Sequence, residues 1–148
     1  MVRSLEINGR ITVYLLENLD PAAWRASPPG GKGRDIASLF AHMISVRLMW
    51  LKAAGGTVPA TEIDKTTATV SQVRKALEES AVALQNLVAG ALETDGRIKN
   101  FKPDVAAFIG YLIAHEAHHR GQISLLARLA GFPVSKQVNF GMWEWGVR

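Results

Sequence analysis

Apolar residues recur at spacings of three and four along four stretches of the chain, which is the pattern of amphipathic helices. Pro and Gly clusters separate these stretches at SPPGGKG, AAGGTVP, ETDGRIKNFKP and AGFPV. The pattern predicts helices over residues 4–19, 35–54, 69 or 71 to 88, and 103–131. The sequence contains no alternating strand pattern bounded by hairpin turns and no internal repeat.

Residue types at the ends of these stretches support the predicted boundaries. Asp35 follows a Gly-rich run and suits the N-cap of the second helix, whereas Asn8 and Gly9 weaken the start of the first. Pro103 suits the first turn of the fourth helix, and Gly131 suits the position just after its end.

Four amphipathic helices of comparable length predict an all-α fold, a four-helix bundle. A chain of 148 residues fits one domain, so residues 1–148 are expected to form a single helical-bundle domain. The tail SKQVNFGMWEWGVR is predicted to lie over the bundle as an irregular C-terminal cap, anchored by burial of Trp143 and Trp145. Gly121 lies inside the fourth helix at a cost of about 1 kcal/mol relative to Ala, so we expect a neighbour, such as either tryptophan, to pack closely on it.

Composition narrows the chemistry that the chain can perform. Hydrophobic residues make up 48% and charged residues 20%, which is typical of a globular protein. The absence of cysteine excludes disulfides, thiolate metal ligands and a thiol nucleophile of the chain's own. A site for a transition metal must therefore use imidazole and carboxylate groups.

Charge and hydropathy bear on partners and location. The net charge of +4 and the pI near 9.7 raise the hypothesis of nucleic-acid binding, but the 17 basic residues are scattered along the chain. We therefore expect a solvated basic surface and no nucleic-acid partner. Neither a signal-peptide core nor a run of about 18 apolar residues is present, so no membrane partner and a cytoplasmic location are expected.

Histidine is concentrated in IAHEAHHRGQ, residues 113–122, which holds three of the four histidines. His115, Glu116 and His119 match H-E-x-x-H, the zinc-protease pattern. Two of these residues also belong to a stripe that alternates spacings of four and three, so it should face the core. Burying an imidazole without a partner costs a few kcal/mol, so each of these histidines is expected to have a hydrogen-bond partner or to bind a metal. The stripe comprises Phe108, Leu112, His115, His119, Gln122, Leu126 and Leu129.

The fourth histidine lies on the apolar face of the second helix. His42 is three residues after Leu39 and four before Val46, so it can approach the fourth helix from across the core. Side chains at i and i+4 have Cβ atoms about 6 Å apart, which lets His115 and His119 direct nitrogens at one ion. A lone histidine on an apolar face is usually a core residue, but this combination favours a divalent metal site, with Zn²⁺ or Ni²⁺ the expected ion.

Neighbouring residues have weaker interpretations. His118 lies about 100° around the helix from its neighbour, so it is expected to lie outside the ligand set. Arg120 is either a clamp for a substrate anion or an ordinary helix-surface arginine. Gln122 either hydrogen-bonds a metal-bound water or belongs to a neutral core network.

The segments GRDIASLFAHMISVRLMWL, AHEAHHRGQISLLARLAG and GMWEWG together resemble the DinB/YfiT-like superfamily, and the resemblance covers nearly the whole chain. It implies an up-down-down-up helical bundle in which one histidine of the second helix and an H-x-x-x-H pair of the last long helix bind a divalent metal. Carried over to this sequence, the implied ligands are His42, His115 and His119.

The activity implied by the resemblance is broad, because the family includes thiol-dependent S-transferases, a mycothiol-dependent maleylpyruvate isomerase and members without a known reaction. The leading hypothesis is a metal-dependent enzyme acting on a small molecule, of the thiol S-transferase or hydrolase type, with an open coordination position for water. A low-molecular-weight thiol as cosubstrate would suit a protein that has no cysteine.

Two further functions remain open at this point. A non-catalytic bundle that binds metal or an apolar ligand, as a sensor or carrier, would have a filled or closed metal site. A peptidase would use Glu116 as its base, although the chain lacks the downstream ligands of zinc proteases. Apolar residues beyond the needs of one bundle, and the resemblance to a family that often dimerises, also suggest a homodimer.

Overall fold

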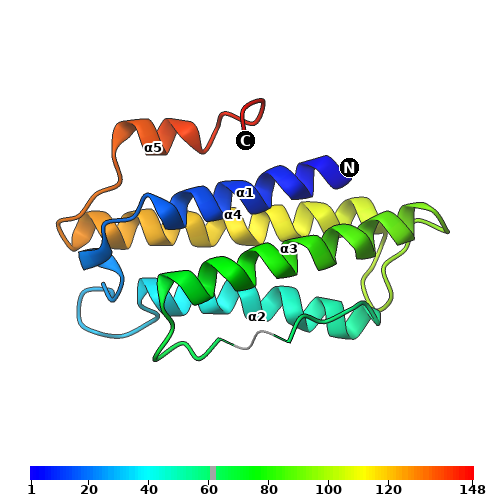
Figure 1. Cartoon of the computed structure of the whole chain (residues 1–148), viewed down its shortest axis with the longest axis horizontal. Helices are drawn as coiled ribbons and strands as arrows, with labels where there is room; N and C mark the ends of the chain where they lie inside the picture. The colour runs from blue at the N-terminus through cyan, green and yellow to red at the C-terminus, as the bar shows by residue number, and fades with distance from the viewer. Residues whose placement is uncertain (61–62) are drawn as a thin grey trace.

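The structure is a computed structural model that describes residues 1–60 and 63–148, and four long helices lie side by side in it (Figure 1). The described residues contain no strand, so the predicted all-α four-helix bundle is confirmed. Residue pattern and structure agree on every long helix to within a few residues. The elements are α1 (Val2–Glu17), the 3-10 helix η1 (Pro21–Ala23), α2 (Ile36–Ala54), α3 (Val70–Leu92), α4 (Val105–Leu129) and α5 (Lys136–Gly141).

The helices follow an up-down-down-up order. Helices α1 and α4 run in one direction and α2 and α3 in the other, as the colours of Figure 1 show. Each of α1 and α2 packs against both α3 and α4. Because consecutive α2 and α3 are parallel, the connection between them must return along the length of the bundle (Figure 1).

Side-chain caps set where the helices begin. Asp35 caps α2, as predicted, and Thr69 caps α3. The fourth helix begins at Val105, two residues later than predicted, because the Asp104 side chain accepts a hydrogen bond from the backbone N–H of Ala107. Pro103 therefore precedes the cap instead of occupying the first turn.

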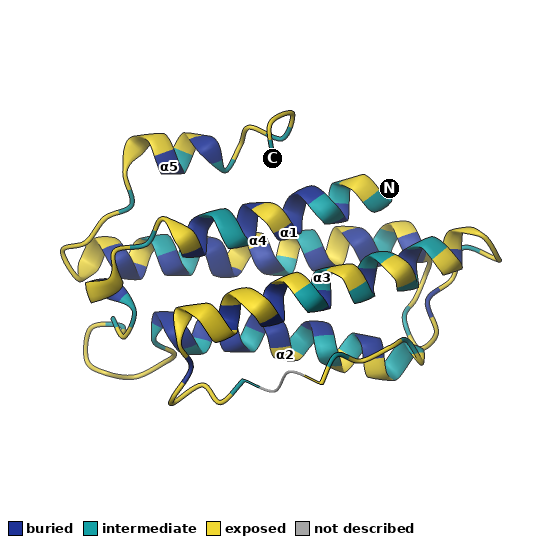
Figure 2. Ribbon diagram, viewed as in Figure 1, coloured by how far each residue is buried: buried dark blue, intermediate teal, exposed yellow. Residues whose placement is uncertain are grey.

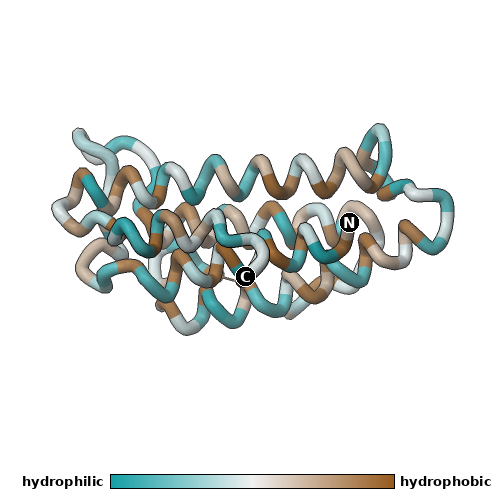
Figure 3. The backbone as a smooth tube through the Cα atoms, turned by 90° about the horizontal axis from the view of Figure 1, so that it is seen from above, coloured by the Kyte–Doolittle hydropathy of each residue, from teal (hydrophilic) through white to brown (hydrophobic). Residues whose placement is uncertain are grey.

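The core consists of two apolar clusters, one toward each end of the bundle. Phe40 and Ile123 are fully buried in one, and Leu84 and Phe108 in the other. Buried positions face the bundle interior while exposed ones lie outside (Figure 2), and apolar positions recur along each helix (Figure 3). The predicted stripe on α4 extends too far, because Leu129 at the end of the helix is 56% exposed.

A buried polar layer separates the two apolar clusters and contains a salt bridge. The Glu116 carboxylate accepts hydrogen bonds from Arg47 Nε at 2.6 Å and Nη2 at 2.9 Å, and both side chains are at most 2% exposed. Arg47 also donates to Ser80 Oγ on α3. Burial alone would raise the pKa of Glu116, but Arg47 and then Arg120 hold that pKa below its usual value.

Helix α1 completes this layer. Asn8 Nδ2 and Thr12 Oγ1 donate to Glu116 Oε2 at 2.8 and 3.0 Å. Arg120 Nη1 donates to Asn8 Oδ1 and Thr12 Oγ1, both at 2.9 Å. The interpretation of Arg120 as a helix-surface arginine is therefore wrong, since this residue is buried. Asn8 bonds across the core instead of weakening α1. We call Asn8, Thr12, Arg47, Ser80, Glu116 and Arg120 the Glu116 cluster.

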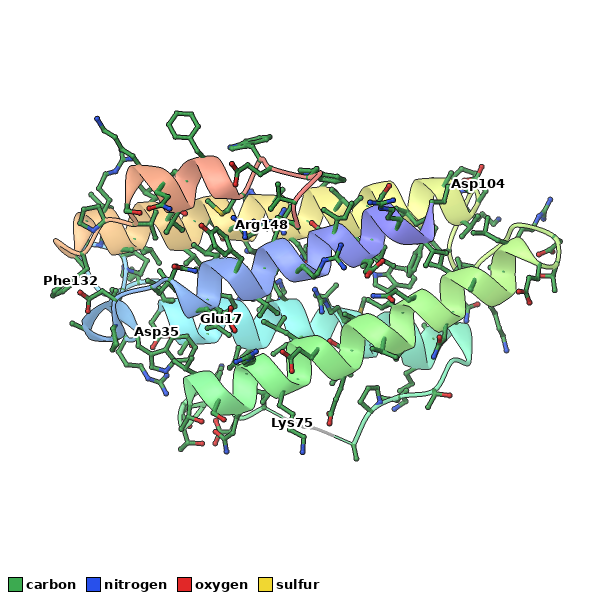
Figure 4. All side chains as sticks on the ribbon, turned by 45° about the horizontal axis from the view of Figure 1, so that its top comes forward. Glu17, Asp35, Lys75, Asp104, Phe132 and Arg148 are labelled. Carbon is green, nitrogen blue, oxygen red and sulfur yellow. The ribbon has the colours of Figure 1, made fainter. Side chains whose placement is uncertain are left out.

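The C-terminal segment lies along α1, as predicted for a cap, but a different residue holds it (Figure 4). The Arg148 guanidinium lies 3.7 Å from the centroid of the Tyr14 ring, and Arg10 Nη2 donates to the Arg148 carbonyl oxygen at 2.6 Å. The predicted burial of Trp143 is wrong, because that side chain is 80% exposed, while Trp145 is half-buried.

The two glycines singled out from the sequence have opposite environments. A Cβ atom at Gly121 would meet no neighbour within 4 Å, so the predicted close packing on this residue is wrong. A Cβ atom at Gly9 would lie 3.4 Å from Ala81 Cβ, so Gly9 allows α1 and α3 to approach closely. The sequence suggested that Gly9 weakens the start of α1. In the structure Gly9 instead lies where α1 packs against α3.

Helix α2 is the one described helix long and apolar enough to cross a membrane, with a mean hydropathy of 1.2. Half of that window is buried inside the bundle. The core helix of a soluble protein meets the same criteria, so this is weak support for a membrane span and is consistent with a soluble protein.

Replacement of Arg47 by Met should lower the free energy of unfolding by about 3–5 kcal/mol, because it leaves the Glu116 carboxylate buried without its partner. Arg47→Met/Glu116→Leu should lose less than the sum of the two single changes. Urea denaturation followed by circular dichroism measures these differences. Arg74→Met, which removes two exposed ion pairs, is the control and should change stability by less than about 1 kcal/mol. An Arg47 variant as stable as this control would contradict the assignment.

Candidate metal centre

Helices α2 and α4 bring His42, His115 and His119 together. The Nε2 atoms of His115 and His119 are 3.1 Å apart, and those of His42 and His115 are 3.4 Å apart. The ligand atoms of all three residues lie within 4.8 Å of one another. His118 is exposed and is not part of this group, in agreement with the sequence interpretation. We call His42, His115 and His119 the three-histidine cluster.

These separations match those around a bound metal ion. Tetrahedral Zn²⁺ with Zn–N bonds of about 2.0–2.1 Å holds its ligand nitrogens about 3.3–3.4 Å apart. The 3.1 and 3.4 Å separations lie close to this value. The donor set also suits Zn²⁺ or Ni²⁺, for which neutral imidazole is a common ligand. The residues present therefore fit a divalent ion.

Gln122 orients one of the imidazoles. His119 Nδ1 lies 2.7 Å from Gln122 Oε1, and because an amide oxygen only accepts, Nδ1 carries the proton. The lone pair of His119 is then on Nε2, the atom that faces the other two histidines. A hydrogen bond of this kind commonly fixes a metal-binding histidine.

The Glu116 cluster sets the rotation of α4. Glu116 lies between the two histidines of α4 in sequence, but its carboxylate points into the core, where Arg47, Asn8 and Thr12 donate to it. Its side chain is 1% exposed. Glu116 is therefore unavailable as a general base, which removes the one reason for proposing a peptidase.

The histidines are held in the form that binds metal. Burial, followed by the charge of Arg34 and of the other two histidines, lowers the pKa of His42 to about 4. Burial is also the largest cause that lowers the pKa of His115 and that of His119. All three imidazoles are therefore neutral at pH 7.

The two sides of the three-histidine cluster differ along the bundle axis. On one side His115 stacks on Tyr111, with ring centroids 6.0 Å apart, and Tyr111 contacts Trp50 and Phe101. On the other side lies a cavity of about 420 Å³, whose lining includes Gln122. Aromatic side chains therefore cover one side. The cavity on the other side is not lined by the three histidines and is connected to them through Gln122, which lies against His119.

Sequence reasoning missed two arginines that shape this region. Arg47 occurs four residues after Met43 and four before Leu51, both fully buried, so an arginine inside an apolar stripe was the available signal. Arg34, whose charge lowers the pKa of His42, lies in a connection without periodicity, so the sequence held no comparable signal for it.

Comparison with known proteins supports the resemblance seen in the sequence. The model of the DinB family matches residues 1–144. A crystal structure of a DinB-like protein from Bacillus cereus superposes with a TM-score of 0.69 at 18% identity, covering 88% of this chain and 90% of that one. At this identity the likeness shows the fold alone. No curated protein matches the sequence.

Replacing any member of the three-histidine cluster by Ala should weaken Zn²⁺ or Ni²⁺ binding by at least tenfold, because each imidazole supplies one bond to the ion. Isothermal titration with each metal measures this change. His118→Ala is the matched control from the same helix and should bind as tightly as the parent. A His42 variant with parental affinity, or a damaging His118 change, would show that the ligand set is wrong.

The metal-free protein should lose stability as the pH falls from about 6.5 toward 4. The unfolded chain then binds protons on histidines whose folded-state pKa values are lowered, so protonation favours unfolding. Urea denaturation in EDTA measures the free energy of unfolding at pH 7.5 and 5.0. The difference between the two values should be smaller for His42→Ala than for the parent, whereas the control His118→Ala should match the parent. Metal occupancy should also persist below the pH of about 6 expected for unshifted histidines. Equal pH dependence in parent and His42 variant would contradict this origin.

Proposed function

Because the chain belongs to the DinB family, we propose that it is a metal-dependent enzyme acting on a small molecule, with His42, His115 and His119 as ligands of Zn²⁺ or Ni²⁺. The observation that carries the proposal is the convergence of their nitrogen atoms from two helices, with separations of 3.1 and 3.4 Å. Hydrogen bonds between neutral imidazoles satisfy these nitrogen atoms only in pairs, whereas one cation can accept a lone pair from all three.

The reaction we propose is transfer of a thiol to an electrophilic acceptor. A divalent ion would lower the pKa of a coordinated thiol and supply a thiolate near neutral pH. The thiol sulfur forms a bond to an electrophilic carbon, the leaving group departs with its electron pair, and the thiol proton passes to solvent. Since the chain has no cysteine, the thiol is a cosubstrate.

The chain's own residues prepare this site in three ways. Burial keeps the imidazoles neutral, so they bind a cation without first losing protons. Gln122 holds His119 in the tautomer whose Nε2 atom is free. Tyr111, which contacts Trp50 and Phe101, covers one side of the cluster, so a ligand would approach from the opposite side.

A non-catalytic metal carrier or sensor is the alternative. Such a protein would hold its ion more tightly with four protein ligands and no open coordination position, as in structural zinc sites. Over residues 1–60 and 63–148, the cluster contains three possible ligand side chains, which leaves one position for a substrate. A cavity of about 420 Å³, lined in part by the Gln122 side chain that hydrogen-bonds His119, also favours an enzyme over a carrier.

Metal-loaded protein, incubated with a low-molecular-weight thiol and a chromogenic electrophile such as 1-chloro-2,4-dinitrobenzene, should consume the thiol faster than the uncatalysed reaction. Treatment with EDTA and the His115→Ala change should each reduce thiol consumption to the uncatalysed rate. Added Zn²⁺ or Ni²⁺ should restore activity to the EDTA-treated parent but not to the His115 variant. His118→Ala should retain full activity. Equal rates with and without metal would refute metal dependence.

A further inference from the structure

The cavity beside the three-histidine cluster is formed at one end of the bundle. Leu39 lies three residues before His42, and Gln122 lies three residues after His119. Because α2 and α4 run in opposite directions, both steps lead about one helical turn toward the same end. Figure 4 labels Asp35, which caps α2, and Phe132, which follows α4, at this end.

The walls of the cavity are largely apolar, and its volume of about 420 Å³ suits a small molecule. Two of its leucines, Leu125 and Leu129, are 53% and 56% exposed. Exposed leucines that border a cavity offer apolar surface that a ligand would cover. The apolar lining residues are Pro28, Pro29, Leu39, Leu125, Leu126 and Leu129.

Arg34 supplies the positive charge in this lining. Its side chain is exposed, and no hydrogen bond or ion pair involves it within the described part of the chain. The neighbouring carboxylate of Asp35 instead lies 3.4 Å from Arg25 and accepts a hydrogen bond from the backbone N–H of Ser38. The guanidinium of Arg34 is therefore available to a ligand.

The position of Arg34 is set by the connection that precedes α2. Gly33 adopts φ +121°, and a Cβ atom there would lie 3.1 Å from Pro28 Cγ, so only glycine fits without displacing the proline. The backbone N–H of Ile36 donates to the carbonyl of Ala26 at 3.1 Å, which ties the end of the connection to its beginning. The wall that contains Arg34 is therefore an ordered part of the fold.

Arg34 is connected to the three-histidine cluster through Gln122. Arg34 and Gln122 line the same cavity, and Gln122 Oε1 lies 2.7 Å from His119 Nδ1. A positive side chain near a divalent cation weakens metal binding by repulsion. The same charge becomes favourable when a negatively charged ligand occupies the space between them.

We propose that Arg34 binds the carboxylate of a small mercaptocarboxylic acid, whose sulfur faces the three-histidine cluster and whose hydrocarbon part lies against the leucine and proline walls. The sulfur end of this assignment rests on the proposed function. The carboxylate end rests on the unpaired arginine and on the cavity that it shares with Gln122. Arg34 is thus a specificity residue for the charge of the thiol substrate.

The experiment compares 3-mercaptopropionate with its uncharged amide, 3-mercaptopropionamide. Co²⁺-loaded protein is titrated with each thiol, and the thiolate-to-cobalt absorption in the near ultraviolet reports binding without turnover. The parent should bind the carboxylate about tenfold more tightly than the amide, as a charge-assisted hydrogen bond at a partly exposed site provides.

Arg34→Gln should remove this preference while binding Co²⁺ alone at least as tightly as the parent, because a repulsive charge is lost. Lys32→Gln, a change of exposed charge in the same connection, is the matched control and should keep the preference. Equal affinity for the two thiols in the parent, or an unchanged preference in Arg34→Gln, would overturn the role of Arg34 and leave the metal proposal standing. Failure of the parent to bind Co²⁺ would overturn both.

Discussion

The ionised carboxylate of Glu116, buried at the centre of the bundle, is the constraint on which the other features depend. Removing a charged pair from water costs several kcal/mol per ion unless good hydrogen bonds replace the lost hydration. Here Arg47, Asn8 and Thr12 donate to the carboxylate, and Ser80 accepts from Arg47, so all four long helices contribute. A one-turn shift of α2 or α4 would break the ion pair, and a shift of α1 or α3 would remove hydrogen-bond partners from it, so the cluster specifies how the helices are aligned.

This alignment also assembles the candidate metal centre. Arg47 and His42 are five residues apart on α2, and Glu116 lies between His115 and His119 on α4. The salt bridge therefore fixes both helices beside the histidines, and the imidazoles need little rearrangement to meet an ion. The H-E-x-x-H pattern thus combines two separate roles: its histidines face α2, while its glutamate faces the core and performs a structural function.

Periodicity allowed the helices, the bundle and the meeting of the three histidines to be predicted, because these depend on which residues share a helix face. The errors occur where contacts between distant segments decide the outcome. Arg120 has a partner on α1 that no local pattern indicates, and the tail contacts α1 through Arg148 while Trp143 is exposed. The environment of Arg34 depends on the path of an irregular connection, which hydrophobic spacing does not describe.

The hydrogen bond between Asn8 and Glu116 joins residues 108 positions apart, near the two ends of the bundle sequence. Contacts of such high sequence separation require closure of a long loop before they contribute stability, which slows folding relative to bundles built from neighbouring hairpins. A fragment that lacks α1 loses two of the donors to the carboxylate, and one that lacks α4 loses the carboxylate itself. On the ribosome, α1 must therefore wait until residue 120 has emerged, so completion of the core is a late and cooperative event in the synthesis of this chain.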